Sequence, residues 1–226
     1  IEKYGADPAR LYTMFTAPPE ATLEWNDAAV EGSYRFLRRV WNHAVRLPAA
    51  ADTVKPVFGR AAADLRREIH TVFKQVDYDY QRMQYNTVVS GAMKMLNALE
   101  DFKGEDGAGD GWAQHECFAI LLRALYPVTP HITQVLWDEL GYASAMGELL
   151  DAPWPEVDPD ALRQDEIELM LQVNGKLRGS IRVAADADKK TIEMAAVHND
   201  VFVKLALGAP VRKVIVVPGR LVNLVI

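Results

Sequence analysis

The sequence predicts an α+β protein, in which an N-terminal all-α helix bundle is followed by a small α/β domain with the element order ββααββ. Three observations support this prediction. Up to about residue 140, hydrophobic residues recur every three or four positions, as they do along one face of a helix. From residue 167 the interval changes to two, the period of a β-strand. Between these parts lies a segment rich in proline and aspartate that follows neither period.

Composition limits the possible classes of protein. Half of the 226 residues are hydrophobic and a quarter are charged, which is typical of a soluble globular protein. No apolar run approaches the roughly 20 residues of a membrane span, so we expect no membrane partner. The single Cys117 excludes an internal disulfide and suits the cytoplasm. Because the first residue is Ile1 and not methionine, we expect a part of a longer polypeptide.

Charge is distributed unevenly along the chain, although the net charge is only −6. Residues 170–226 contain nine lysines or arginines and four acidic residues, giving +5, so the remainder carries −11. A basic domain joined to an acidic body is a known feature of proteins that bind a polyanion.

The first two predicted helices are marked by capping residues. One begins at Asp7-Pro8, an N-cap followed by proline, and ends before Ala17-Pro18-Pro19. The other begins after an N-cap at Asp27 and ends near Leu47-Pro48. Its predicted hydrophobic stripe consists of Leu37, Val40, Trp41, Ala44 and Val45.

Four further helices are predicted over residues 60–76, 80–102, 112–126 and 129–141. Asp77-Tyr78-Asp79 separates the first two of these. The acidic, glycine-rich stretch of residues 104–111 is predicted as a turn, and it lacks the lysine and hydroxyl residue of a phosphate-binding loop. Thr129 and Pro130 occupy cap and first-turn positions. His131 beside them is interpreted as structural, because no second metal-ligating residue stands at a suitable spacing.

Residues 142–166 lose the helical period and contain several prolines. We therefore place a linker at residues 154–166, between a helical domain at 1–153 and a C-terminal domain at 167–226. In that domain, Asn174-Gly175 predicts a two-residue turn between strands, and a second strand pair is expected around Pro218-Gly219. Two short helices are expected between the strand pairs, the first of them capped by Asp188.

The hairpin around Asn174-Gly175 carries a group of cations. Lys176, Arg178 and Arg182 share one strand parity, opposite to that of Leu177 and Ile181, so they are predicted to lie on one face. The later strands add Arg212, Lys213 and Arg220. Taken alone, the pattern is more typical of an ordinary hairpin with a solvated outer face.

A second basic group lies on the helix that follows Asp27, where four arginines and His43 are predicted to lie away from the hydrophobic stripe. The arginines are Arg35, Arg38, Arg39 and Arg46. They either pair with acidic neighbours across the bundle or contact phosphates, and the sequence does not decide between these alternatives. No arrangement of nucleophile, base and orienting group is visible, so we predict no catalytic residue in this chain.

Several segments resemble leucyl-tRNA synthetases of the bacterial type, a family of class I aminoacyl-tRNA synthetases. The resemblance rests on residues 3–15, on Ala17-Pro18-Pro19 with Leu23-Glu24-Trp25, on Glu31-Gly32, on residues 35–41, on residues 127–133 with Trp137, on Asp151-Ala152-Pro153-Trp154-Pro155, and on residues 173–179 and 211–219. These segments follow one another in the order expected for the family and cover essentially the whole chain.

The resemblance implies a function for each domain. The helical domain would be of the anticodon-binding type, and the C-terminal domain would meet the outer corner of tRNA(Leu), where the D and T loops touch. Enzymes of this family attach leucine to tRNA with ATP and magnesium. The adenylate-site signatures His-Ile-Gly-His and Lys-Met-Ser-Lys-Ser are absent here, as is an editing domain. We therefore expect a monomer that docks tRNA, with no cofactor, no metal and no activity of its own.

Within that resemblance we predict the residues that contact tRNA. They are Asn174, Lys176, Arg178, Arg182, Lys213 and Arg220, with Arg35, Arg38, Arg39 and Arg46 as a second candidate group. Charge and strand parity select these residues, whereas the partner comes from the resemblance. One alternative is a part of an isoleucyl or valyl enzyme, but the chain lacks the paired cysteines and the long heptad tail of those proteins. The other alternative is a free-standing RNA-binding or protein-interaction module.

Overall fold

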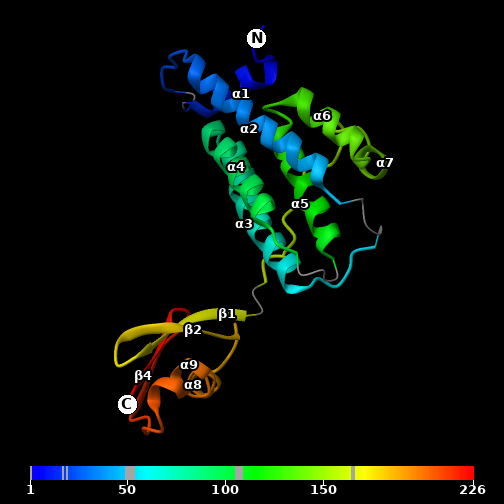
Figure 1. Ribbon diagram of the computed structural model, residues 1–226. Coiled ribbons are helices and arrows are strands. Elements are labelled where there is room, and N and C mark those ends of the chain that lie inside the picture. Colours follow the sequence, from blue (N-terminus) through cyan, green and yellow to red (C-terminus); the bar gives the residue numbers. More distant parts are fainter. Residues whose placement is uncertain (1, 17, 19, 49–53, 105–108, 164–165) are drawn as a thin grey trace. The chain divides into compact units, whose positions relative to one another are not determined.

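The structure is a computed structural model that describes residues 2–16, 18, 20–48, 54–104, 109–163 and 166–226 (Figure 1). By internal contacts the chain forms two compact units, Ile1–Leu162 and Arg163–Ile226. The first consists of helices, and the second contains a sheet and two helices, which confirms the predicted α+β class. Over the described ranges, no helix combines the length and the apolar character that crossing a membrane requires.

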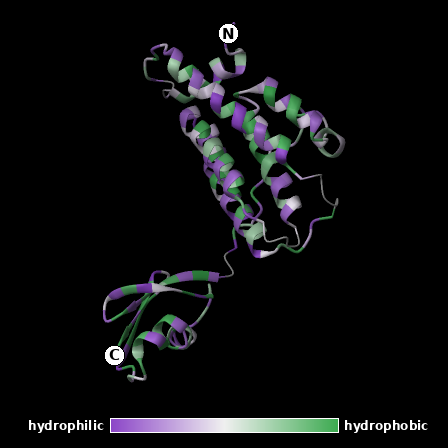
Figure 2. Cartoon of the chain, viewed as in Figure 1, coloured by the Kyte–Doolittle hydropathy of each residue, from purple (hydrophilic) through white to green (hydrophobic). Residues whose placement is uncertain are grey.

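The helical unit is built around α5, which is apolar on nearly every side. Its helices are α1 (Ala6–Thr16), α2 (Asp27–Arg46), α3 (Arg60–Gln81), α4 (Tyr85–Asp101), α5 (Asp110–Leu125), α6 (Pro130–Glu139) and α7 (Tyr142–Met146). Helix α5 packs against α3, α4 and α6. Helices α2 and α3, by contrast, carry both hydrophobic and hydrophilic residues along their length (Figure 2). Gly91 allows α3 and α4 to approach closely, since a Cβ there would lie 2.3 Å from a methyl group of Val76.

Two predicted features of the helices are wrong. Asp77-Tyr78-Asp79 does not separate two helices, because α3 continues to Gln81 and the chain turns at Met83, where φ is 55°. The aspartates are tolerated because Asp79 accepts a hydrogen bond from Gln75, one turn earlier, at 2.8 Å. The hydrophobic stripe of α2 is narrower than predicted, because Trp41 and Val45 are exposed.

Helix α2 is capped by a different residue from the one predicted. The N-cap is Asn26, whose side chain accepts a hydrogen bond from the Ala29 backbone at 3.1 Å, and Asp27 is the first residue of the helix. The predicted end of α2 near Leu47 is confirmed. Residues 49–53, between α2 and α3, and residues 105–108, within the predicted turn at 104–111, lie outside the described residues.

Part of the proline-rich segment after residue 141 is ordered against the helices. Tyr142–Met146 forms α7, a helix that the sequence pattern did not predict. Further along, Trp154 donates a hydrogen bond to Asp77 at 2.8 Å, and Asp158 forms ion pairs with Arg66 and Lys55. The side chains of Trp154 and Asp158 thus attach this segment to the helices. The segment therefore belongs to the helical unit, which ends at Leu162.

The C-terminal unit has the predicted order ββααββ. Its elements are β1 (Glu166–Val173), β2 (Lys176–Ala184), α8 (Lys189–Val197), α9 (Asp200–Ala206), β3 (Lys213–Val217) and β4 (Leu221–Val225). The sheet order is β2-β1-β4-β3; β1 and β4 are parallel, and the other neighbours are antiparallel. Helices α8 and α9 lie on one side of this sheet (Figure 1). Between them and the sheet lies a core that includes Leu169, Leu171, Phe202, Val222 and Leu224.

Candidate nucleic-acid interface

The turn of the β1–β2 hairpin is fastened to strand β4. Asn174 and Gly175 both have positive φ, 50° and 77°, which is the geometry of a type I′ turn and confirms the predicted hairpin. The Asn174 side-chain oxygen accepts a hydrogen bond from the Ile226 backbone at 3.1 Å. In return, the Gly175 backbone donates to the side-chain oxygen of Asn223 at 3.0 Å. The oxygen of Asn174 therefore stabilises the hairpin, and only its amide nitrogen is left for a ligand.

A β-bulge in the hairpin changes which side chains share a face. Leu171 is opposite Gly179, whereas Gln172 is opposite Leu177, so Arg178 is an extra residue on β2. Lys176 pairs with the buried Val173 and hence has the parity of the helix-covered face. The predicted single face for Lys176, Arg178 and Arg182 is therefore wrong, because strand parity holds only while the ladder is regular.

Leu177 shows the same effect of the bulge. It was predicted to share a face with Ile181, but it pairs with Gln172 on the uncovered face and is 61% exposed. Beyond the bulge the regular alternation returns. Ile181 is buried, and Arg182 lies opposite Glu168 on the uncovered face.

The predicted cations lie at two places on the sheet. Lys176 and Arg178 adjoin the Asn174-Gly175 turn, and Lys213 is near the same end because it pairs with Val225, next to the residues that hold the turn. Arg182 and Arg220 lie farther from that turn, along β2 and in the β3–β4 connection. All five side chains are exposed, and none forms an ion pair with another residue in the described part of the unit.

The arginines of α2 behave differently from one another. Arg39 bonds both carboxylate oxygens of Glu100 and donates to Asn97 of α4 at 2.6 Å. Arg35 lies 3.9 Å from Glu31. Arg38 and Arg46 are exposed and have no carboxylate partner among the residues that the structure describes. Ion pairs with other residues of the helical unit thus neutralise Arg35 and Arg39, and Arg38 and Arg46 are left to bind an anion.

His43 does not belong to this basic group. Its ring packs against Phe118 with the centroids 5.4 Å apart, on the core side of α2. Burial lowers the pKa of His43, so the imidazole is neutral at physiological pH and adds no positive charge to the surface.

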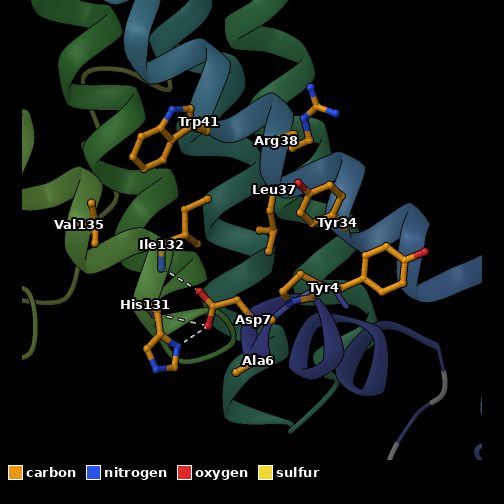
Figure 3. Close-up of a pocket in the computed structure, with 12 residues that line it drawn as sticks. Tyr4, Ala6, Asp7, Tyr34, Leu37, Arg38, Trp41, His131, Ile132 and Val135 are labelled. Atoms are coloured by element: carbon orange, nitrogen blue, oxygen red, sulfur yellow. Dashed lines mark hydrogen bonds and ion pairs between the residues drawn. The ribbon is translucent and has the colours of Figure 1, made fainter. Parts of the chain in front are cut away.

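A pocket of about 500 Å³ lies between α1, α2 and α6 (Figure 3). Its lining is mostly apolar, with Trp41, Tyr34 and Ile132 on its walls. Asp7 was predicted to cap its own helix, but it lies inside α1 and is buried. Its carboxylate accepts hydrogen bonds from the backbone of Ile132 at 2.7 Å and from the His131 ring at 2.8 Å.

Asp7 thereby caps α6 from another helix. The Thr129 side chain, predicted to fill that position, makes no capping bond. An acidic group is favourable at a helix N-terminus because the first backbone N–H groups have no partner within the helix. Sequence reasoning missed this contact because the two residues are more than a hundred positions apart. His131 is engaged here, and over the described ranges no three histidine, cysteine or acidic side chains are grouped as a metal site would require.

A buried ionic cluster, also missed by sequence reasoning, fastens residues 153–162 to the bundle. Arg66 is only 3% exposed and binds Glu116 at 2.5 and 3.0 Å and Asp158 at 2.6 Å. Lys55 contacts the same oxygen of Asp158 at 2.7 Å, and the Asp158 backbone donates to the His70 ring at 3.1 Å. No spacing in the sequence connects these five residues, so no local signal could have predicted the cluster.

The ionic cluster shifts the pKa values of its carboxylates. Burial alone would raise the pKa of Glu116, but hydrogen bonds from His70 and Arg66 hold it below its ordinary value. Burial opposes the charge of Asp158 in the same way, and hydrogen bonds from Lys55 and Arg66 hold its pKa well below the usual range. Both groups are therefore charged near neutral pH, and they form a structural clamp with no proton to transfer.

Comparison with known proteins identifies the family. A family model described as the anticodon-binding domain of tRNA ligase matches residues 63–193. The chain belongs to this family. The matched range begins in α3 and ends in α8, so it includes residues of both compact units.

Individual relatives agree with this assignment and with the resemblance found in the motifs. The chain is 68% identical over 234 residues to a protein named Leucine--tRNA ligase from Polaromonas sp. (strain JS666), and 71% identical over 232 residues to one of the same name from Variovorax paradoxus (strain S110). Each alignment covers the whole of this chain and 26% of the relative. The chain therefore spans about a quarter of the length of these relatives.

A solved structure confirms the fold. It is described as the ternary complex of Agrobacterium radiobacter K84 agnB2 LeuRS-tRNA-LeuAMS, and it matches with a TM-score of 0.67 at 24% identity. The match covers 99% of this chain and 29% of that one.

Proposed function

We propose that this chain is the tRNA-docking part of a leucine--tRNA ligase, the enzyme that attaches leucine to tRNA(Leu) using ATP. In this proposal the C-terminal unit binds the outer corner of the tRNA, and the protein acts as a monomer in the cytoplasm. Relatives that align with the whole chain are named Leucine--tRNA ligase, and the solved structure of similar fold was determined as a complex with tRNA.

The observation that carries the proposal is the set of unpaired cations in the C-terminal unit. Lys176, Arg178, Arg182, Lys213 and Arg220 are exposed and have no carboxylate partner in the described part of that unit. Unneutralised cations raise the energy of a folded unit through mutual repulsion unless a polyanion binds to them. Folded RNA supplies closely spaced phosphates, and binding cations to these phosphates releases counterions.

The arginines of α2 are a second candidate surface for tRNA. Arg38 and Arg46 have no carboxylate partner among the described residues, whereas Arg39 is held by Glu100 and Asn97. We propose that this surface contributes less than the C-terminal unit does, because a phosphate would have to compete with the bonds that Arg39 already makes.

The test is a titration of leucine tRNA into the 226-residue chain at several salt concentrations. The double variant Lys176→Ala, Arg178→Ala should bind more weakly and show a salt slope smaller by up to about two, because roughly one counterion is released per phosphate contact. The matched control is Arg60→Ala, Arg67→Ala, which removes the same charge from arginines that pair with Asp64. Equal affinities and slopes for the two double variants would remove the hairpin from the interface.

Aminoacylation is assigned to parts of the ligase outside this chain. The adenylate-site signatures are absent from the 226 residues, and we predict no catalytic residue here. Supplied with leucine, ATP and magnesium, the isolated chain should bind tRNA without forming leucyl-tRNA. Formation of radiolabelled leucyl-tRNA by the pure chain would contradict this assignment.

A further inference from the structure

The sheet of the C-terminal unit has one face that no described element of the unit covers. Helices α8 and α9 pack on the face that presents Leu171 and Leu224 (Figure 1). Burial and strand pairing place these residues on the opposite face: Glu166, Glu168, Met170 and Gln172 of β1; Leu177, Ser180, Arg182 and Ala184 of β2; Lys213, Ile215 and Val217 of β3; and Leu221, Asn223 and Val225 of β4. A solvated sheet face is normally polar, but half of these positions are aliphatic.

The aliphatic residues form a continuous row across three strands. Met170 is in register with Leu221, which is in register with Val217. Met170 is 47% exposed and Val217 is 38% exposed, although both lie within regular strands. Single exposed hydrophobic residues are ordinary, whereas a contiguous exposed group is typical of a binding surface.

The adjacent row combines aliphatic and amide side chains. Leu177, Gln172, Asn223 and Ile215 follow one another across the four strands. Asn223 uses its oxygen to accept from the Gly175 backbone, which leaves its amide nitrogen as a donor. The Gln172 side chain forms no hydrogen bond with the described residues, so both its donor and its acceptor are available.

Charged residues flank these two rows. Arg182 and Lys213 lie on the same face on the two outer strands. The face also carries Glu166 and Glu168, of which Glu168 accepts a hydrogen bond from Ser180 at 2.5 Å. The surface is thus apolar at its centre, has amides on one side of the apolar row and carboxylates on the other, and carries one cation on each outer strand. A flat group with apolar faces, a hydrogen-bonding edge and a phosphate on each side would satisfy all three features, and a nucleobase in RNA is such a group.

We propose that this face, which we call the sheet platform, is the binding site for one unpaired nucleobase of the tRNA. The base lies against Met170, Leu221 and Val217, and its edge meets the amides of Gln172 and Asn223. Arg182 and Lys213 contact the neighbouring phosphates. The inference rests on the proposed function, because it names the part of the tRNA that the C-terminal unit would read. The net charge of +5 over residues 170–226 favours RNA over a protein partner.

The test uses the 226-residue chain with Met170, Ile215 and Val217 all changed to threonine, a residue that strands accommodate well. The matched control is Val203→Thr, an exposed valine on α9 away from the sheet platform. We expect the platform variant to bind leucine tRNA about tenfold more weakly with an unchanged salt slope, because it removes stacking and no charge. Far-UV circular dichroism and thermal unfolding verify that both variants are folded.

A second arm locates the base. Nucleotides of the D and T loops are made abasic one at a time, and each tRNA is titrated with the parent chain and with the platform variant. One abasic position should weaken binding to the parent about tenfold and leave binding to the variant unchanged, since the contact is already lost there.

Three outcomes would overturn the inference. If the platform variant binds as the parent does while Lys176→Ala, Arg178→Ala weakens binding, the platform is wrong and the proposed function stands. If the parent chain does not bind tRNA at all, both fail together. If the parent dimerises in sedimentation experiments and the platform variant does not, the face is an interface between copies of the chain and not a base-binding site.

Discussion

Cations have different surroundings in the two units of this protein. In the helical unit, Arg39 is held by Glu100, Arg66 by Glu116 and Asp158, and Arg67 by Asp64. In the C-terminal unit, Lys176 and Lys213 have no such partner among the described residues. The helical unit has an excess of acidic residues, and a carboxylate of the described residues lies within 4 Å of half of its arginines. The difference teaches that a positive charge indicates an anion-binding surface only where the fold has not already neutralised it.

The largest expected effect concerns the most buried cation of the helical unit. Arg66→Ala should lower the free energy of unfolding of this unit by about 3–5 kcal/mol, because it leaves Glu116 and Asp158 without their partner. Arg67→Ala removes an exposed pair with Asp64 and should cost less than about 1 kcal/mol.

Urea unfolding followed by tryptophan fluorescence measures the effect of Arg66→Ala. It reports on the helical unit alone, since all five tryptophans precede residue 163. If Arg66→Ala and Arg67→Ala cost the same, the ionic cluster is not the clamp described above.

Acidification should act on the same cluster. The folded state holds the pKa values of Glu116 and Asp158 below their ordinary values of 4.5 and 3.8. Their contribution to stability is therefore fully present above about pH 5 and is lost as the pH falls through the lowered folded values. The urea midpoint of the helical unit should fall between about pH 5 and about pH 2, and it should fall less in Arg66→Ala. Parallel pH profiles for the parent and the variant would contradict this prediction.

The contact between α1 and α6 should have an intermediate effect. Asp7→Ala removes the buried carboxylate that accepts from Ile132 and His131, and it should lower the unfolding free energy by about 2 kcal/mol. Asp7→Asn keeps one hydrogen-bond acceptor and should lower the unfolding free energy by less than Asp7→Ala does. The control is Asp27→Ala, because the cap of α2 is Asn26. A smaller loss for Asp7→Ala than for Asp27→Ala, measured by urea unfolding, would rule out the capping role.

The smallest effect compares one cation from each unit directly. Lys213→Ala should reduce the salt slope of tRNA binding by about one, the amount expected for a single phosphate contact. Arg39→Ala should leave the slope unchanged, because its guanidinium already serves Glu100 and Asn97. Fluorescence titrations at three salt concentrations separate the two cases. A larger change for Arg39→Ala would make α2 the principal tRNA surface and reverse the comparison.

Local patterns predicted the architecture well. The helical period located the six longer helices, and the Asn174-Gly175 turn located the hairpin, because these signals arise from residues that are neighbours in the chain. Helix boundaries were less accurate where a polar residue finds a partner one turn away, as Asp79 does with Gln75. The short helix α7 has too few residues for a period to be visible.

The candidate site was predicted only in part for the same reason. The sequence identified which residues are basic, but strand parity was misleading at Arg178, where the bulge depends on how β1 and β2 pair. It also could not distinguish Arg39 from Arg38, since Glu100 reaches the former only when α2 and α4 pack together. The row formed by Met170, Leu221 and Val217 exists only through the pairing of three strands.

By itself, the sequence determined the α+β class, the order of elements, the charge difference between the two parts and the family. These properties depend on composition and on interactions between residues close in the chain. Tertiary structure alone decided which cations are neutralised, that Asp7 caps α6, and that one face of the sheet combines an aliphatic row with amides and cations. The physical reason is that ion pairs, long-range caps and strand registers join residues far apart in sequence, and only folding brings them within contact distance.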